Sequence, residues 1–318
     1  MSAEKSVEVI ELTRQFGDFT AVDHLNFEIP QGEIFGLLGP NGAGKTTTMR
    51  MLCGILTPTS GEARVMGFDV ARQSEKVKQR IGYMSQKFAL YNDLTVYENL
   101  NFYANLYDIP RKRIKTRLSE LIEMAGLRGR EKHLSRDLSG AWRQRLALAC
   151  AIVHEPPMLF LDEPTAGVDP VSRREFWEMI YALAGRGVSV LATTHYMDEA
   201  EFCNVIGMMY RSRMIALSDP DALRESMQGT LFELDCREPG RAEQILRELP
   251  IVEDVAAHGV LLHVQVASEG QRPALEQALG AAGVVVDRIE RVLPSLEDVF
   301  VSLVETENRR QVRANLTS

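Results

Sequence analysis

Cysteine is scarce in this 318-residue chain, and its four copies lie far apart, at Cys53, Cys150, Cys203 and Cys236. No two of them form a CxxC pair, which argues against a zinc cluster and against a disulfide framework. Such usage is typical of a reducing cytosol, where thiols fill space in the core.

Long apolar runs are also missing. No window approaches the ~20 apolar residues that a membrane-spanning helix needs, and the N-terminal sequence MSAEKSVEVIEL has no long apolar core of a signal peptide. We therefore expect that any role at a membrane is that of a peripheral subunit.

Positive charge is in deficit. Lys and Arg number 36 against 44 Asp and Glu, which gives a formal net charge of −8. This balance disfavours a general nucleic-acid surface. The basic run at 111–117 is the exception, and at helical spacing its simplest interpretation is a solvated face, with contact to lipid headgroups or a partner as the alternative. The length and the 45% apolar fraction predict a globular protein of about two domains.

The first two thirds of the chain alternate between buried strands and helices. Compact apolar runs at 32–39, 157–164 and 188–195 read as strands, and helical patterns occupy 45–56, 95–126 and 172–184. This alternation predicts an α/β fold with a mostly parallel sheet and helices packed on its faces.

The pattern of apolar and polar residues changes near residue 219. Strand patterns at 230–236, 251–256, 259–266 and 284–291 surround helical patterns at 240–249 and 271–282. The order β-α-β-β-α-β is that of a ferredoxin-like α+β unit. Alternation at 260–266 predicts a sheet with one wet face. Ser295 and Asp298 have capping-box spacing at the start of a last helix.

These patterns predict three parts in the chain, with the boundary between the first two near 218–228. They are an α/β domain at 5–218, a second domain at 219–305, and a polar, flexible tail at 306–318.

The stretch GPNGAGKTT matches the phosphate-loop pattern GxxxxGK[ST] between a strand and a helix. Backbone N–H groups of such a loop surround phosphate oxygens, and the helix N-terminus adds partial positive charge. Lys45 suits the β- and γ-phosphates of ATP, and the Thr46 hydroxyl suits Mg²⁺. The candidate ATP-binding residues here are Gly39, Pro40, Asn41, Gly42, Ala43, Gly44, Lys45, Thr46 and Thr47.

Two adjacent acids end the strand pattern at 157–164. Asp162 and Glu163 would be costly there unless a cation or a substrate uses them. Asp162 suits a partner of Mg²⁺, and Glu163 can polarise a water molecule for in-line attack on the γ-phosphate.

Taken in order, the phosphate loop, Gln86, LSGAW, LFLDEPTAGVD and His195 resemble the nucleotide-binding subunit of an ABC transporter over residues 5–218. The stretch RQRLALACAIVHEPPMLFLDEPTAGVDP and the ending PSLEDVFVSL resemble bacterial exporters with a separate ABC-2-type permease. That group includes subunits similar to the daunorubicin-resistance ATPase.

The resemblance implies further roles. Phe16 would stack on adenine, with core filler as the alternative, and Gln86 would touch Mg²⁺ and the attacking water. His195 would contact the γ-phosphate, and Asp169 would lie in a loop that crosses a dimer. The γ-phosphate held by the other subunit would be bound by Ser139, Gly140 and Ala141.

LSGAW departs from the family at two positions, where glycine and glutamine are usual. Ala141 keeps the backbone N–H and adds one methyl, and Trp142 replaces a side chain that is not the chief phosphate donor. The following helix should turn Leu146, Cys150 and Val153 inward. We therefore expect LSGAW to be a working variant of the family's signature motif.

After Gln86, Phe88, Leu90, Tyr91, Leu94 and Tyr97 form more apolar surface than a loop needs. They predict either a groove for a short permease helix or packing under the helical subdomain.

The resemblance implies an ATPase that converts ATP and water to ADP and phosphate and powers export from the cytoplasmic face of the cell membrane. Its partners would be an ABC-2-type permease and a second ATP-binding subunit, identical or not. The second domain would be regulatory or would support the dimer, and specificity for the transported substrate would lie in the permease. The alternatives are an ATP-binding module with little turnover and a soluble ABC ATPase acting on ribosomes or DNA.

Overall fold

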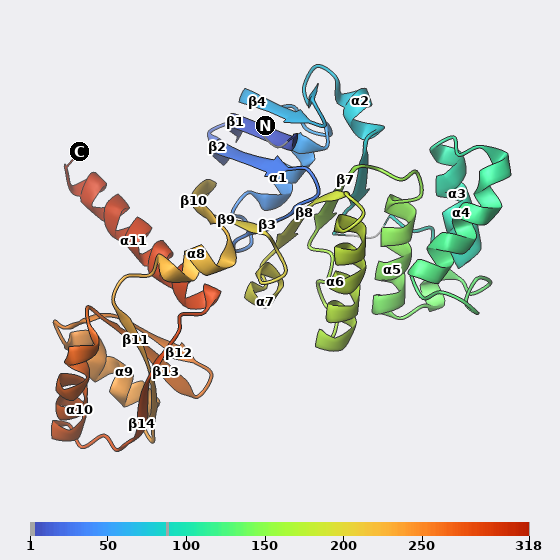
Figure 1. Ribbon diagram of the computed structural model, residues 1–318. Coiled ribbons are helices and arrows are strands. Elements are labelled where there is room, and N and C mark those ends of the chain that lie inside the picture. Colours follow the sequence, from blue (N-terminus) through green and yellow to red (C-terminus); the bar gives the residue numbers. More distant parts are fainter. Residues whose placement is uncertain (1–3, 87–88, 318) are drawn as a thin grey trace. The chain divides into compact units, whose positions relative to one another are not determined.

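The computed structural model describes residues 4–86 and 89–317. Contacts between Cα atoms divide the chain into two compact units, Met1–Pro220 and Asp221–Ser318 (Figure 1).

The first unit is built on a six-stranded sheet in the order β10-β9-β3-β8-β7-β6. Its strands are parallel except β10, which pairs antiparallel with β9 at one edge. Every residue of β3, β7 and β8 is buried, which explains why these strands read as continuous apolar runs. The predicted parallel sheet is confirmed, with β3 at Ile34–Leu38, β6 at Ile81–Met84, β7 at Met158–Asp162, β8 at Ser189–Thr194, β9 at Val205–Tyr210 and β10 at Arg213–Ser218.

A second, antiparallel sheet in this unit has the order β2-β1-β4-β5. Irregular pairings between its two long strands interrupt the alternation of apolar and polar residues. Glu11 and His24 take positive φ values of 50° and 49° at these irregularities. The strands are β1 at Lys5–Phe16, β2 at Phe19–Pro30, β4 at Ser60–Val65 and β5 at Phe68–Asp69.

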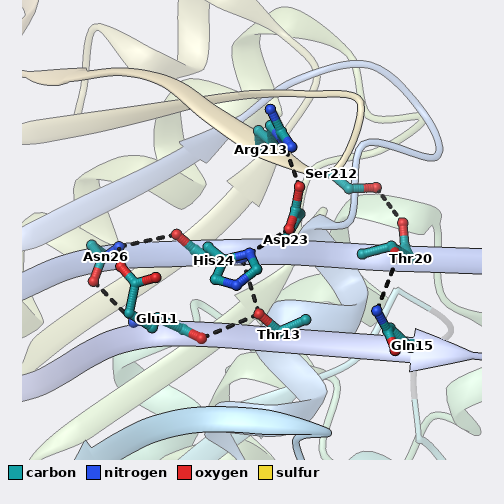
Figure 2. Close-up of polar contacts among 9 residues, drawn as sticks. All are labelled: Glu11, Thr13, Gln15, Thr20, Asp23, His24, Asn26, Ser212 and Arg213. Atoms are coloured by element: carbon teal, nitrogen blue, oxygen red, sulfur yellow. Dashed lines mark hydrogen bonds and ion pairs between the residues drawn. The ribbon is translucent and has the colours of Figure 1, made fainter.

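Polar contacts fasten β2 to the hairpin between β9 and β10 (Figure 2). Asp23 donates its backbone N–H to the Ser212 carbonyl at 2.8 Å, and the Ser212 hydroxyl donates to the Thr20 carbonyl at 2.8 Å. Arg213 Nε lies 2.6 Å from the Asp23 carboxylate. Residues 21 and 22 of β2 lie beside Gly44, in the glycine-rich loop that follows β3.

Seven α-helices of the described chain precede Pro220. The segment 95–126, which has a helical sequence pattern, is divided by a turn at 107–110. In this turn Asp108 has a φ of 53°, and Pro110 precedes the next helix. A capping box between Thr95 and Glu98 begins α3. The helices are α1 at Lys45–Leu52, α2 at Ser74–Lys78, α3 at Val96–Leu106, α4 at Arg111–Met124, α5 at Gly140–Ala151, α6 at Pro170–Ala184 and α7 at Met197–Ala200.

The second unit has an antiparallel sheet in the order β12-β13-β11-β14 with helices between its strands. This is the strand order of a ferredoxin-like split βαβ unit, as predicted. Its elements are α8 at Pro220–Glu225, β11 at Thr230–Cys236, α9 at Pro239–Glu248, β12 at Val252–His258, β13 at Leu261–Val266, α10 at Arg272–Ala281, β14 at Val286–Val292 and α11 at Leu296–Thr317.

One prediction about this sheet is wrong, because β13 is covered on both faces. His263 and Gln265, which alternation assigned to a wet face, are buried. His263 Nδ1 lies 2.7 Å from Asp298 at the start of α11. The same carboxylate pairs reciprocally with Ser295, so the predicted capping box is confirmed. Burial raises the pKa of Asp298, but the bonds from Ser295 and His263 outweigh it and hold the pKa below its usual range.

The polar segment at 306–318 also differs from the predicted flexible tail, because α11 continues through Thr317. An i,i+4 ion pair joins Glu305 and Arg309 at 3.0 Å, and Arg309 donates to the Glu253 carbonyl at 3.2 Å. The contact with Glu253 joins residue 309 of α11 to β12.

Candidate functional site

The glycine-rich loop connects buried β3 to α1. Gly44 caps α1 with a φ of 106°, and a Cβ at this position would lie 2.5 Å from the Ala21 carbonyl oxygen. Only glycine fits that backbone and that approach. Pro40, Asn41 and Gly42 are exposed at the tip of the loop, Gly39 and Ala43 are buried, and Thr46 and Thr47 are half-buried in the first turn of α1.

Lys45 is buried and turns back across the loop. Its ammonium donates to the carbonyls of Gly39 at 2.6 Å and Pro40 at 3.1 Å, and lies 3.7 Å from Glu163 Oε1. Burial lowers the pKa of Lys45, while the charges of Glu163 and Asp162 act to raise it. The cation therefore depends on negative charge nearby, which a phosphate would also supply.

Asp162 occupies the buried end of β7. Its Oδ1 atom accepts hydrogen bonds from the hydroxyls of Thr46, at 3.0 Å, and Thr193, at 2.8 Å. One carboxylate and one hydroxyl thus face each other at the start of α1. Such oxygen donors suit Mg²⁺, which proteins hold with one or two carboxylates alongside substrate phosphates.

Glu163 follows Asp162 in a left-handed conformation, with a φ of 47°. Its backbone N–H is fixed by the Thr193 hydroxyl at 3.0 Å. Its carboxylate accepts from Gln86 Nε2 at 2.8 Å and lies 3.5 Å from His195 Nδ1. The hydrogen bond to the Thr193 hydroxyl fixes this strained backbone. The carboxylate therefore points toward Lys45, Gln86 and His195, which are far apart in the sequence.

Phe16 lies at the end of β1 and is 47% exposed. The Arg14 guanidinium lies 4.5 Å above its ring. The ring is therefore not core filler, and the alternative interpretation of this residue is wrong. An aromatic surface remains open at this edge of the unit.

Four further predicted site residues lie at helix starts and not in the cluster around Glu163. Ser139 is exposed and precedes α5, whose first turn contains Gly140 and Ala141. Ala141 has a negative φ, so its methyl group causes no backbone strain. Asp169 caps α6 by accepting the Ser172 N–H at 3.0 Å, and this bond lowers the pKa of Asp169.

Trp142 is held between two arginines. The Arg130 guanidinium lies 4.2 Å from its ring and that of Arg145 lies 5.1 Å away. Arg145 in turn forms an ion pair with Glu175 of α6. The i,i+3 spacing of Trp142 and Arg145 could have indicated half of this contact, whereas Arg130 and Glu175 carry no signal in the sequence. As predicted, Leu146, Cys150 and Val153 are buried.

The geometry defines a phosphate-loop nucleotide-binding protein, and comparisons with known proteins agree. An ABC transporter family profile matches residues 22–166, and a profile for the C-terminal domain of DrrA1-3-like ATP-binding proteins matches 219–304. The chain is 34% identical over 310 residues to the daunorubicin resistance ATP-binding protein DrrA3 of Streptomyces coeruleorubidus, covering 96% of this chain and 98% of that one.

Two further likenesses cover about 70–80% of this chain. The chain is 52% identical over 221 residues to the ATP-binding protein YbhF of Escherichia coli, covering 70% of this chain but only 38% of YbhF. The structure of CbiO1 from Clostridium perfringens, part of the ABC transporter complex CbiONQ, superposes with a TM-score of 0.65 at 26% identity, covering 78% of this chain and 96% of CbiO1. No helix within the described residues is long and apolar enough to cross a membrane.

The chain therefore belongs to the ATP-binding subunits of ABC transporters, in the group that carries a DrrA-like C-terminal domain.

The arginine contacts of Trp142 predict a measurable contribution to stability. Trp142→Gln should lower the free energy of unfolding of the first unit by about 1–2 kcal/mol, because two cation–π contacts of about 0.5–1 kcal/mol each are lost. Trp142→Phe, which keeps an aromatic face, should lose less. Trp177 is then the one tryptophan left and is buried in α6, so its fluorescence in urea reports this unit. A Gln variant as stable as the native protein would contradict the assignment.

Proposed function

We propose that this protein is the ATP-hydrolysing subunit that powers export through a separate ABC-2-type permease. The observation that carries the proposal is the convergence of Lys45, Gln86 and His195 on the Glu163 carboxylate, beside the Thr46–Asp162 pair. Family membership and the DrrA-like domain support the export role. The subunit would work as a peripheral protein at the cytoplasmic face of the cell membrane.

In this proposal the loop N–H groups and Lys45 bind the phosphates of ATP, and Phe16 stacks on adenine. Thr46, Asp162 and Gln86 would hold Mg²⁺, which neutralises developing charge on the phosphates. Glu163 orients a water molecule and accepts its proton as the oxygen attacks the γ-phosphorus, and the bond to the β-phosphate oxygen breaks. His195 stabilises the γ-phosphate, giving ADP and phosphate.

A second subunit would complete each site. Ser139 and Asp169 are exposed, and within the described residues no hydrogen bond or ion pair joins either of them to the Glu163 cluster. Both lie at helix starts, where backbone N–H groups attract anions. They are therefore suited to the ATP held by the partner subunit, identical or not. We assign the second unit a regulatory or dimer-supporting role.

The apolar segment after Gln86 is the proposed contact with the permease. Tyr91 and Tyr97 are exposed, at 48% and 42%, whereas Leu90 and Leu94 are half-buried. The Tyr91 ring meets that of Phe102 at 4.6 Å, edge to face. Leu94, Phe102 and Leu106 line a shallow hollow on α3. Phe88 lies outside the described residues. This surface fits the apolar face of a short helix.

The assigned role of Glu163 predicts separation of binding from turnover. Glu163→Gln keeps the shape and the contacts to Gln86 but cannot accept a proton, so hydrolysis should fall by about 100-fold or more while ATP still binds. Gel filtration with Mg·ATP should show a trapped dimer. Glu178→Gln, an exposed change on α6, is the matched control. Phosphate release by Glu163→Gln at the native rate would contradict the role of Glu163 as the base.

The signature variant predicts unequal effects at its two ends. Ala141→Gly should change the ATPase rate of the assembled transporter less than about tenfold, because φ is already negative and the N–H is retained. Ser139→Ala should lower the rate by about 100-fold, because the lost hydroxyl has no substitute in stabilising the transition state. Steady-state phosphate release ranks the two. If Ala141→Gly confers ATPase activity on a native protein that has none, the natural LSGAW motif is impaired. That result would favour the alternative of an ATP-binding module with little turnover.

The docking surface predicts site-specific crosslinks. All four native cysteines are buried, so an added surface cysteine is the reactive one. Cysteines at Leu90, Tyr91, Leu94 and Tyr97 should crosslink to a short helix of the permease in the assembled transporter. Lys115→Cys, exposed on α4 of the same helical subdomain, should not. Equal yields at Lys115 and at Tyr91, or none at any of the four positions, would count against the surface.

A further inference from the structure

Arg173 lies in the first turn of α6, four residues after Asp169. Only 12% of its side chain is exposed. One terminal nitrogen, Nη2, donates to the carbonyl of Val168 at 3.5 Å, immediately before Asp169. The guanidinium is therefore anchored in the loop that we assign to the dimer contact.

The rest of the same guanidinium faces the segment that follows His195. Its Nη1 atom lies 2.7 Å from the Asp198 carboxylate, and its Nε atom lies 3.3 Å from Glu199 Oε1. Its carbon Cζ lies 4.3 Å from the centre of the Tyr196 ring. That ring in turn lies 4.1 Å from the imidazole of His195. One side chain thus spans the two loops.

Glu199 is the buried end of this arrangement, with 1% of its side chain exposed. It accepts a hydrogen bond from the hydroxyl of Thr165, two residues after Glu163. Burial raises the pKa of Glu199, and the contacts with Thr165, Thr194 and Arg173 act in the opposite direction. A carboxylate buried this deeply needs its cation, so each partner fixes the other.

We propose that Arg173 is a positioning residue that holds the Asp169 loop and His195 in one fixed arrangement. The inference rests on the proposed hydrolysis of ATP, for which His195 must meet the γ-phosphate while Asp169 meets the partner subunit. In the part of the chain that the structure describes, no hydrogen bond or ion pair joins Arg173 to the phosphate loop. Arg173 keeps His195 and Asp169 at a fixed separation, so that both contacts can form at the same time. This matters because small displacements of catalytic groups reduce rates steeply.

The neighbouring Arg174 supplies a matched control, because it carries the same charge on the same helix turn but is exposed. In the full-length protein, Arg173→Met should lower kcat for ATP by about tenfold or more. It should leave the KM for ATP within about threefold, because the phosphate loop is untouched. Arg174→Met should behave as the native protein. A folded Arg173→Met variant with native kcat overturns the proposal.

Loss of stability is the competing explanation, because Arg173→Met leaves the Glu199 charge unpaired. The double variant Arg173→Met/Glu199→Gln removes both charges and should recover Tm without recovering kcat. Arg173→Lys keeps a cation beside Glu199 but cannot reach Val168, Asp198 and Tyr196 at once, so it should fold and still turn over slowly. Native kcat in either variant would overturn the positioning role.

A second readout is independent of turnover. The His195 imidazole proton resonance, assigned with His195→Gln, senses the adjacent Tyr196 ring. It should move in Arg173→Lys and stay in place in Arg174→Met. If the native protein fails to hydrolyse ATP, the proposed function fails, while this resonance still reports the arrangement of the loops. An unmoved resonance in Arg173→Lys overturns this inference alone.

Discussion

The buried carboxylate of Asp162 joins three parts of the first unit at one atom. Thr46 brings the start of α1 to it, Thr193 brings the end of β8, and β7 supplies the acid itself. A carboxylate at this depth is tolerated only with hydrogen bonds and nearby positive charge. Its field reaches into the core, where burial first and Asp162 second raise the pKa of the Cys53 thiol well above its usual range.

Thr193 extends this constraint to the next residue. Its hydroxyl donates to Asp162, and it accepts the backbone N–H of Glu163. This bond holds Glu163 in the left-handed conformation, and the carboxylate is thereby turned toward Lys45, Gln86 and His195. The acid that would hold the metal and the acid that would orient water are therefore placed by one hydroxyl.

Much of this could be predicted from the sequence, since the phosphate loop and the Asp162–Glu163 pair need only local spacing and two buried strands. Trp142 between Arg130 and Arg145, and Arg173 against Glu199, could not. Their partners come from elements brought together by the fold, and no periodicity marks them. The same holds for His263, which alternation assigned to solvent but which Asp298 of α11 covers. The length of α11 was missed because its polar end has an ion pair, Glu305–Arg309, and no apolar stripe.

Burial divides the predicted site residues into two groups with different needs. Lys45, Asp162 and Glu163 are inaccessible or nearly so and satisfy one another within a single subunit. Ser139 and Asp169 are exposed at helix starts, and Asp169 caps α6. A group held only by its own helix is free to meet a second molecule, but its position is then set by what anchors the helix. For Asp169 that anchor is Arg173, and for Ser139 it is the Trp142 contact with Arg130 and Arg145. The polar networks behind these exposed residues are therefore where the two halves of the site would be aligned. Arginine suits both networks, because its planar guanidinium carries several donors in a fixed arrangement.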